Sequence, residues 1–258
     1  MSPKNSIKPE LTVFIASWNT RKETEAAIRL TLRQQGVSLR LVVGDGGSHD
    51  GSRDMLQRLA EQGALTLETT EGGRTHGQWL DEWTARVETP LCAFVDSDLL
   101  LLRQGALRQM ILRLRSSGAA LVTCEQIPEI PDYVSDINGD RSRIAPRPAP
   151  WLVVFRSEQV RALDVSWQYR WERRPDLPEG ALSWDVGASV HVGLTAAGLP
   201  VETMPAAFRR SYWHVGGRSW RSDRRGRLGL RDGLHSVGVQ AALVASRAVV
   251  RLPAPARP

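Results

Sequence analysis

Two acidic residues follow directly on one of the most apolar stretches of the sequence. Residues 91–95 read Leu-Cys-Ala-Phe-Val, and Asp96-Ser97-Asp98 comes next. A continuous apolar run of this length predicts a central strand of a parallel sheet, buried on both faces. Such sheets bind ligands at the carboxyl ends of their strands, so Asp96 and Asp98 would project there. Spaced two residues apart, these carboxylates can share one hard cation or one metal-bound diphosphate.

A second polar group follows an earlier predicted strand. Residues 45–52 read Asp-Gly-Gly-Ser-His-Asp-Gly-Ser, and the glycines permit a tight backbone path near a flat ligand. Asp45 would accept hydrogen bonds from a ribose or from an imino group of a base. In the alternative interpretation, Ser48 and Asp50 only cap the next helix. The spacing does not match a dinucleotide-binding loop, because His49 occupies the third glycine position.

Apolar runs and helical patterns alternate through the first half of the chain. Strands are predicted at residues 11–17, 39–43, 64–69, 91–95 and 119–124. Helices are predicted at residues 21–35, from about 52 to 62, at 76–87, and around an apolar stripe at 107–114. A capping box formed by Thr20 and Glu23 would begin the first helix. This alternation predicts an α/β fold with a single doubly wound, mostly parallel sheet.

The regular alternation ends after residue 124. Residues 125–150 are rich in Pro, Asp, Gly and Arg, which predicts a long surface loop or lid. A strand is expected at 151–155, then an irregular stretch to about residue 182, and Ser183 would cap the next helix. One or two short strands are expected within 201–212, and a last amphipathic helix at about 234–247.

Composition places the chain among ordinary soluble globular proteins. Its formal net charge is +6, with 41% hydrophobic and 24% charged residues. Cys92 and Cys124 lie in apolar runs, which favours core thiols in a reducing compartment. The first residues lack the apolar core of a secretory signal, and no apolar stretch approaches the roughly 18 residues of a membrane span. We therefore expect a cytoplasmic protein. The excess of arginine leaves open a peripheral contact at the inner membrane surface, or reflects base composition alone.

Three motifs together resemble the family 2 glycosyltransferases. They are a strand ending in Ser17-Trp18-Asn19, the Asp-x-x-Ser-x-Asp-Gly-Ser group at 45–52, and an apolar strand ending in Asp-x-Asp. The resemblance covers about residues 11–102 and implies a GT-A fold, a nucleotide-diphosphate sugar donor, inversion at the anomeric carbon and a divalent metal, Mn²⁺ or Mg²⁺. Trp18 stands where tyrosine is frequent, and Gly44 where a larger residue often precedes the acid. Neither change removes a charge that the chemistry needs.

The resemblance also implies roles for individual residues. Asp45 corresponds to the nucleoside-binding acid, Asp98 to a metal ligand, and Asp96 to a residue near the donor sugar or ribose. Further donor-binding positions are Ser17, Trp18, Asn19, Arg74 and Ser97. His76 belongs to the same loop as Arg74, which touches the nucleotide in family members.

Inverting transfer also needs a base that takes the acceptor proton. The resemblance places Asp185 in this role, since an acidic residue opens a helix at this point in the family, although Trp184 replaces the usual Glu. Alternatively, Asp185 is only a favourable partner of the helix dipole. Some related enzymes complete the metal site with a late histidine, here His214, and an imidazole beside carboxylates favours Mn²⁺ over Mg²⁺. Otherwise His214 packs beneath a loop.

The acceptor would be bound by the second half of the chain. We expect one GT-A domain over residues 1–258, with a nucleotide-sugar-binding half at about 11–124, an irregular acceptor-binding half at about 125–247 and a tail at 248–258. Arginines that follow His214 would close over the diphosphate as a lid, or face solvent; they are Arg218, Arg221, Arg224 and Arg225. The aromatic stretch 167–171 would form an acceptor platform or pack internally. The acceptor is a small molecule, a glycan or a lipid-linked molecule.

Two other functions compete with a soluble, non-processive glycosyltransferase. A sugar-nucleotide nucleotidyltransferase would normally carry a glycine-rich basic loop after the first strand, where this chain has Trp18-Asn-Thr-Arg. A nucleic-acid-binding module would use the Arg- and Trp-rich carboxyl-terminal third. The nucleic-acid module predicts binding that falls steeply with salt and survives Asp98→Ala. The glycosyltransferase predicts metal-dependent nucleotide-sugar binding that Asp98→Asn abolishes.

Overall fold

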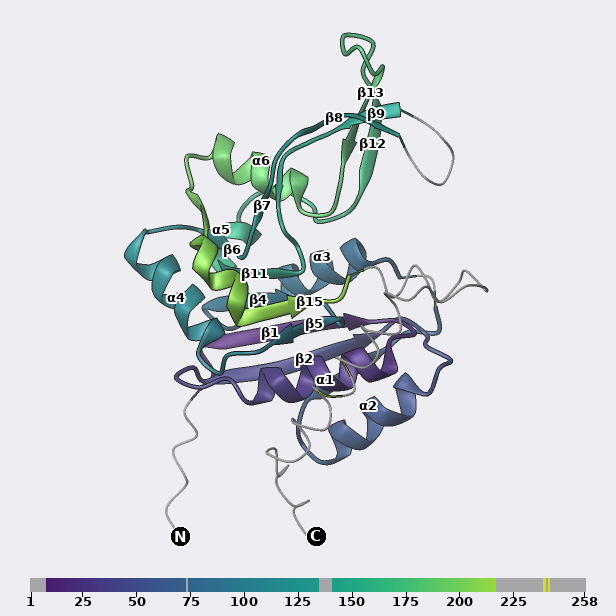
Figure 1. Cartoon of the computed structure of the whole chain (residues 1–258), viewed down its shortest axis with the longest axis vertical. Coiled ribbons are helices and arrows are strands. Elements are labelled where there is room, and N and C mark those ends of the chain that lie inside the picture. Colours follow the sequence, from purple (N-terminus) through teal and green to yellow (C-terminus); the bar gives the residue numbers. More distant parts are fainter. Residues whose placement is uncertain (1–7, 73, 135–140, 217–238, 240, 242–258) are drawn as a thin grey trace.

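A seven-stranded sheet forms the centre of the molecule in the computed structural model, which describes residues 8–72, 74–134, 141–216, 239 and 241 (Figure 1). In spatial order the strands are β14 (Val201–Thr203), β6 (Leu121–Thr123), β11 (Leu152–Arg156), β4 (Leu91–Val95), β1 (Leu11–Ser17), β2 (Leu39–Asp45) and β3 (Thr66–Thr69). Neighbouring strands run parallel, except that β11 is antiparallel to both β4 and β6. The predicted α/β fold with a mostly parallel sheet is confirmed. The direction of β11 was not predictable, because an apolar run looks the same in either direction.

Helices cover both faces of this sheet, and each face has its own core. The helices are α1 (Arg21–Leu32), α2 (Ser52–Glu61), α3 (His76–Arg86), α4 (Ala106–Ser116), α5 (Ser157–Arg161) and α6 (Ala188–Ala196). Helices α1, α2 and α4 contribute to one apolar cluster, and α3, α5 and α6 to the other. Strand β1 serves both, because Val13 and Ile15 enter the first cluster while Phe14 enters the second.

The start of helix α1 differs from the prediction in its capping. Thr20 makes no side-chain cap hydrogen bond. Its hydroxyl instead lies 2.9 Å from that of Thr24 and 3.1 Å from that of Ser97. A capping box is present at α3, where Thr75 Oγ1 accepts from the Gln78 amide and Gln78 Oε1 accepts from the Thr75 amide. The hydroxyl of Thr20 therefore ties the start of α1 to the acidic turn after β4.

The prediction of a surface loop over residues 125–150 is wrong. This segment contains β7 (Gln126–Ile127), β8 (Ile130–Val134), β9 (Arg141–Ile144) and β10 (Arg147–Pro148). Strands β8 and β9 join β12 (Arg170–Arg173) and β13 (Ala181–Trp184) in a second sheet of order β12-β13-β9-β8. We call this four-stranded sheet the arm, since it projects from the body above the main sheet (Figure 1). Consecutive strands pair in β8–β9 and in β12–β13, whereas β9 and β13 are far apart in the sequence, so no local signal predicted their pairing.

The predicted helix cap at Ser183 is also wrong. Ser183 is part of β13, and helix α6 begins only at Ala188. Gly187 is the N-cap residue, with a φ of 87°, and its peptide amide donates to the Trp167 carbonyl at 3.3 Å. Glycine accepts this left-handed conformation without the strain that a side chain would bring.

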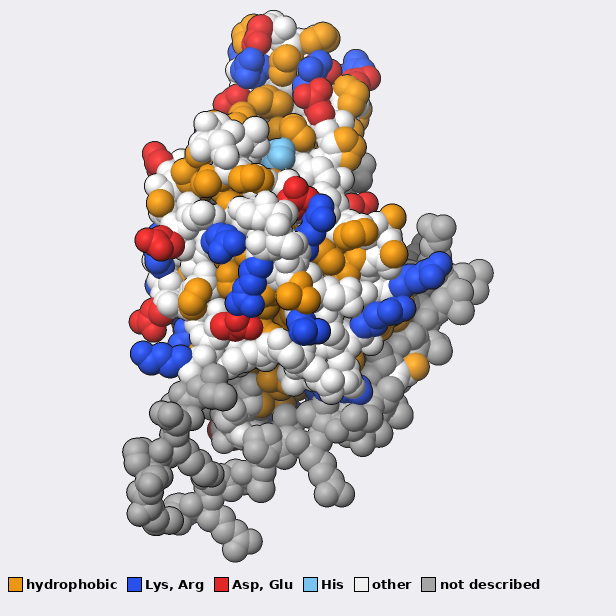
Figure 2. Space-filling view, turned by 90° about the vertical axis from the view of Figure 1, so that its left-hand side faces the viewer, with side chains coloured by type: hydrophobic (Ala, Val, Ile, Leu, Met, Phe, Trp, Pro, Cys, Tyr) orange, Lys and Arg blue, Asp and Glu red, His pale blue; other side chains and the backbone are white. Residues whose placement is uncertain are grey.

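Charged side chains of both signs are mixed over the face that carries α4 (Figure 2). Arg113 of α4 pairs with Glu202 at 2.6 Å, and Arg115 pairs with Glu10 at 2.7 Å. The excess of arginine thus forms no continuous basic surface on this face. None of the helices in the described part of the chain is long and apolar enough to cross a membrane. The predicted last helix at 234–247 falls almost wholly outside the described residues.

Candidate active site

The two acids that follow β4 lie in a tight turn at the carboxyl end of the sheet. The Asp96 amide donates to the Trp151 carbonyl at 2.9 Å, and the Leu99 amide donates to the Asp96 carbonyl at 3.0 Å. The chain then enters the short strand β5 (Leu99–Leu101). The Asp98 side chain is 10% exposed and that of Asp96 is 24% exposed. Trp151 directly precedes β11, so the start of this strand helps to fix the turn.

A distant segment brings His214 to this turn. Strand β15 (Tyr212–His214) pairs antiparallel with β5, which sets His214 opposite Leu99, and the Val215 amide donates to the Asp98 carbonyl at 3.0 Å. His214 Nε2 lies 3.3 Å from Asp98 Oδ1 and 3.8 Å from Asp96 Oδ2. The imidazole also stacks on Trp151, with the ring centroids 4.8 Å apart. Backbone pairing and ring stacking together hold the imidazole against both carboxylates.

A second histidine contacts Asp96, at the carboxylate oxygen that does not contact His214. His76, the first residue of α3, has its Nε2 atom 3.5 Å from Asp96 Oδ1. Asp96 therefore lies between two imidazoles, one on each carboxylate oxygen. The sequence suggested His76 as a nucleotide contact because it belongs to the same loop as Arg74. Only the tertiary structure pairs it with Asp96.

The electrostatics of this group favour a positively charged partner. Burial raises the pKa of Asp96 and is the largest effect. The contacts with His76 and His214 lower this pKa and the charge of Asp98 raises it, so that the pKa is raised in total. Burial lowers the pKa of His214, but its hydrogen bond to Asp98 and the charges of both acids outweigh this and raise it. One ligand atom from each of Asp96, Asp98 and His214 lies within 4.8 Å of the others. Two carboxylate oxygens and one imidazole nitrogen suit a divalent cation such as Mn²⁺.

Asp45 ends strand β2 at the same edge of the sheet and is completely buried. Its Oδ1 atom accepts hydrogen bonds from the amides of Gly47 at 3.1 Å and Ser48 at 2.9 Å. Its Oδ2 atom is buried and has no hydrogen-bond partner among the described residues. A buried carboxylate oxygen without a partner is costly, so this atom has the capacity to accept one more hydrogen bond.

The capping alternative for the loop 45–52 holds for Asp50 alone, because Ser48 Oγ accepts from the Asn19 amide rather than from α2. Asp50 Oδ1 accepts from the amide of Ser52 at 3.0 Å, and its Oδ2 accepts from the amide of Arg21 at 2.9 Å. These are the first residues of α2 and α1, so one carboxylate serves two helix starts. Burial raises the pKa of Asp50, but these hydrogen bonds together with that from the Ser52 hydroxyl outweigh it and lower the pKa.

Residues 17–19, at the end of β1 and directly after it, contact helix α1 and the loop 45–52. Ser17 is buried, with its hydroxyl 3.0 Å from that of Thr24. The Asn19 amide donates to Ser48 Oγ, and its side-chain Oδ1 accepts from the His49 amide, both at 2.9 Å. Trp18 between them is partly exposed. The hydroxyls of Ser17 and Ser97 thus meet protein partners, whereas Trp18 keeps a free surface.

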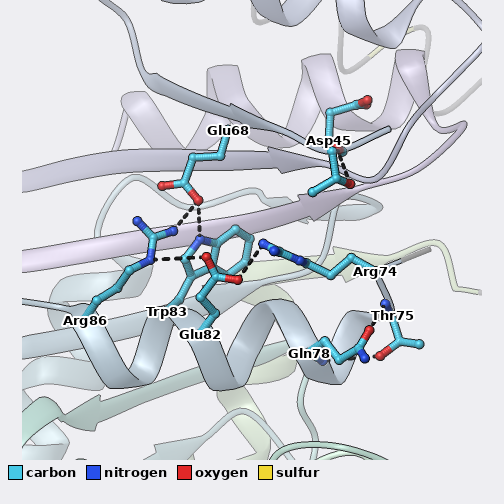
Figure 3. Close-up of polar contacts among 9 residues, drawn as sticks. Asp45, Glu68, Arg74, Thr75, Gln78, Glu82, Trp83 and Arg86 are labelled. Atoms are coloured by element: carbon cyan, nitrogen blue, oxygen red, sulfur yellow. Dashed lines mark hydrogen bonds and ion pairs between the residues drawn. The ribbon is translucent and has the colours of Figure 1, made fainter. Parts of the chain in front are cut away.

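Arg74 lies along helix α3 in the structure (Figure 3). Its Nη1 atom is 2.5 Å from Glu82 Oε2, and its guanidinium lies 4.5 Å from the centre of the Trp79 ring. It lines a shallow polar pocket with Thr70, Gly72, Gln78 and Glu82. Asp45 ends β2 above this helix in the same view (Figure 3).

Asp185 stands apart from the Asp96 group. It follows β13 and precedes the first turn of α6, so the predicted position inside the helix is wrong. Its Oδ2 atom lies 2.7 Å from Arg147 Nη2, and its Oδ1 accepts from the Val186 amide at 2.8 Å. The Asp185 side chain is 38% exposed, whereas that of Arg147 is 12% exposed. Among the contacts of the described residues, none joins Asp185 to Asp96, Asp98 or His214.

A family model described as Glycosyl transferase family 2 matches residues 12–171. The chain belongs to this family. It is a glycosyltransferase, and the resemblance seen in its three motifs is confirmed. No curated protein matches the chain.

Two solved structures are similar to this chain. A mannosyltransferase from Pyrobaculum calidifontis, in complex with GDP-Man and Mn²⁺, has 19% sequence identity and a TM-score of 0.57 over 96% of this chain and 78% of that chain. S. aureus TarS 1-349 in complex with UDP has 16% identity and a TM-score of 0.46 over 62% of this chain and 50% of that chain. The first likeness confirms the GT-A fold of this glycosyltransferase.

Several residues of the glycosyltransferase site had no sequence signal. Arg147 begins β10 and Trp151 directly precedes β11. Neither residue belongs to a motif. Gly44 was noted only as unusual, and the structure explains it: a Cβ there would lie 2.7 Å from Trp83 and 3.0 Å from Trp79. The absence of a side chain lets α3 pack closely on β2 beside Asp45. The predicted lid arginines from Arg218 to Arg225 lie outside the described residues.

Proposed function

We propose that this glycosyltransferase moves a single sugar from a nucleotide-diphosphate sugar to an acceptor nucleophile, with inversion at the anomeric carbon and with the aid of a divalent cation. The observation that carries the proposal is the meeting of Asp96, Asp98 and His214, whose ligand atoms lie within 4.8 Å of one another. They meet at the carboxyl end of the strands, where α/β sheets bind ligands. The similar mannosyltransferase was solved with GDP-Man and Mn²⁺, which supports this choice of donor class and cation.

Asp98 and His214 are the proposed cation ligands, and Asp96 lies beside them near the donor sugar or ribose. A bound divalent cation would neutralise the negative charge that develops on the departing diphosphate. Two carboxylates at this turn bring negative charge, and the contact of His214 with both acids provides the nitrogen of the set. The residues therefore fit Mn²⁺ or Mg²⁺, and the imidazole favours Mn²⁺.

Asp45 is the proposed nucleoside-binding acid. Its unpartnered Oδ2 atom offers an acceptor to a base imino group or a ribose hydroxyl. Trp18 and Asn19 line the nucleotide pocket together with Asp45 in this proposal. Ser17 and Ser97 also line it, and hydroxyl contacts with Thr24 and Thr20 fix their side chains. Arg74 contributes after leaving Glu82 or through the pocket that it lines with Gly72.

Asp185 is the proposed general base. In an inverting displacement, the acceptor oxygen forms a bond to the anomeric carbon while the bond to the diphosphate oxygen breaks, and the base takes the acceptor proton. Arg147 Nη2 lies 2.7 Å from one oxygen of Asp185, and this contact orients the carboxylate. A carboxylate that is partly exposed can receive a proton from a bound acceptor.

Thermal unfolding with a panel of nucleotide-sugars, with and without Mn²⁺, tests this function. We expect one donor to raise the melting temperature only when Mn²⁺ is present, because a ligand that binds the folded state stabilises it by mass action. Asp98→Asn should abolish this increase, whereas Asp54→Asn, an exposed acid in α2, should retain it. The proposal fails if no nucleotide-sugar shifts the melting temperature of the unmodified protein.

A further inference from the structure

The arm exposes an unusual share of large apolar side chains. Of those that are exposed in the described part of the chain, four lie in or beside the arm: Tyr133, Val134, Tyr169 and Trp171. Tyr169 is 58% exposed and Trp171 is 47% exposed. The others lie singly on the body, where isolated exposed side chains are ordinary. A group of exposed rings on one element marks a binding surface.

Strand alternation places three of these rings on one face of the arm. Successive side chains of a strand point to opposite faces, and residues paired across strands share a face. The register pairs Trp171 with Ser183, Ser183 with Ile144, and Tyr133 with Ser142, which lies two residues from Ile144. Tyr169, two residues before Trp171, has its hydroxyl 3.4 Å from Ser183 Oγ and therefore faces the same way.

The floor between the rings is small and hydroxylated. Ser142 and Ser183 are buried, and their hydroxyls lie 2.8 Å apart. With the Tyr169 hydroxyl they form a short chain of groups that can donate or accept hydrogen bonds. Among the paired strand positions of this face, Arg173 at the edge is the one charged residue.

The opposite face of the arm has a different character. Arg143 pairs there with Glu129 and Glu179, both at 3.3 Å, and Arg170 lies 4.7 Å over the Trp184 ring. Leu182 packs with Ala188 of α6. Arg143, Arg170 and Leu182 thus have protein partners on that side, where Val134 is the exposed apolar residue. The three exposed rings lie on the aromatic side.

The aromatic face is joined to the proposed active site at two points. Ser183 precedes Asp185 by two residues, so the Cα atoms of these two residues are at most roughly 7 Å apart. At the other end, the Trp167 amide donates to Asp81 Oδ1 at 2.6 Å and Gln168 Nε2 donates to Asp81 Oδ2 at 2.7 Å. Asp81 belongs to α3, whose first residue contacts Asp96.

We propose that Tyr133, Tyr169 and Trp171 form a saccharide-binding platform that holds the acceptor for transfer. This inference rests on the proposed function and names its acceptor class: an uncharged carbohydrate. The C–H groups on one side of a sugar ring are apolar and stack on the electron-rich face of an aromatic ring, while the sugar hydroxyls bond to exposed polar groups such as the Tyr169 hydroxyl. A membrane-binding face would instead combine apolar side chains with several basic ones, whereas Arg173 is the one basic residue among the described paired positions of this face.

Ligand-detected NMR saturation transfer with mannobiose, cellobiose, chitobiose and maltotriose tests the platform. We expect at least one saccharide to bind the complete protein. Trp171→Ala should weaken its binding about tenfold, the change that the loss of one ring contact produces, and Trp171→Phe should retain most of it. Leu112→Ala, which changes an exposed apolar residue of α4, is the matched control and should bind as the unmodified protein does.

The outcomes separate the platform from the proposed function. The platform is overturned if no saccharide binds while a nucleotide-sugar still raises the melting temperature, or if Trp171→Ala binds saccharide as well as the unmodified protein. It is also overturned if Trp171→Ala abolishes sedimentation with vesicles of equal parts phosphatidylcholine and phosphatidylglycerol and no saccharide competes. Because Trp171 lies outside the donor site, donor binding by Trp171→Ala should be unchanged.

Discussion

At the scale of single residues, the chemistry depends on carboxylates whose surroundings differ. Asp96 and Asp98 share contacts with histidine, whereas Asp45 is buried with one oxygen unpartnered. Asp185 is held by Arg147 at a separate place. These environments support three separate tasks in the proposed function: cation binding, nucleoside recognition and proton transfer.

Cation binding should depend on pH through His214. Metal binding requires the neutral imidazole, and contacts with the two acids raise the pKa of His214. We therefore expect Mn²⁺ affinity, measured by calorimetry, to increase as the pH rises through the range from about 5 to 8 in which histidine titrates. His214→Gln should bind Mn²⁺ at least about tenfold more weakly and with a smaller pH dependence. An unchanged pH profile in this variant would show that His214 is not a ligand.

Loss of the proposed base should affect turnover more than binding. Asp185→Asn keeps the size of the side chain but removes its capacity to take a proton, so we expect kcat to fall by about 100-fold or more with little change in the KM for the donor. Arg147→Lys should cause a smaller loss, because it keeps the charge beside Asp185. Initial rates at saturating acceptor measure both. Equal activity of Asp185→Asn and the unmodified protein would exclude this base.

At the scale of elements, helix α3 packs closely on strand β2 at Gly44, the residue that precedes Asp45. Trp79 and Trp83 stack with centroids 5.0 Å apart, and Phe14 stacks on Trp83 at 4.6 Å. Trp83 Nε1 donates to Glu68 at 2.9 Å, and Arg86 also pairs with Glu68 (Figure 3). This cluster requires Gly44, because a side chain would enter the ring of Trp83.

Gly44→Ala should therefore destabilise the protein by overpacking. The added methyl group meets Trp83 at 2.7 Å, and we expect a cost of about 1–3 kcal/mol with a clear fall in the melting temperature. Gly105→Ala is the matched control, since the nearest atom to its Cβ lies 4.0 Å away. Its effect should stay within about 0.5 kcal/mol. Equal melting temperatures for the two variants would contradict the packing argument.

At the scale of the whole molecule, one acid of α3 joins the arm to the body. Asp81 accepts hydrogen bonds from the Trp167 amide, the Ser166 hydroxyl and the Gln168 side chain. The indole of Trp167 is buried in the core and donates to Thr84 at 3.0 Å. The chain that leads into β12 thus begins at a fixed point beside the proposed site.

Asp81→Ala should loosen this connection without unfolding the main sheet. It leaves the Trp167 amide without its acceptor, at a cost of about 1–3 kcal/mol. Hydrogen exchange should increase in β12 and β13 and stay unchanged in β1 and β2. Asp54→Ala, at an exposed position of α2, should alter neither region. Uniformly faster exchange over both sheets would mean that Asp81 supports the whole fold rather than the arm.

The sequence by itself determined the features that depend on neighbouring residues. The apolar run of β4 with Asp96 and Asp98, the alternation of strands and helices through residue 124, and Asp45 at the end of β2 follow from local periodicity and short motifs. Only the tertiary structure decided the pairings between distant segments: His214 beside Asp98 through β5 and β15, the antiparallel insertion of β11, and the arm with its aromatic face. The physical reason is that a strand's own sequence encodes its burial but not its partner, because pairing depends on which edge the remainder of the chain leaves available.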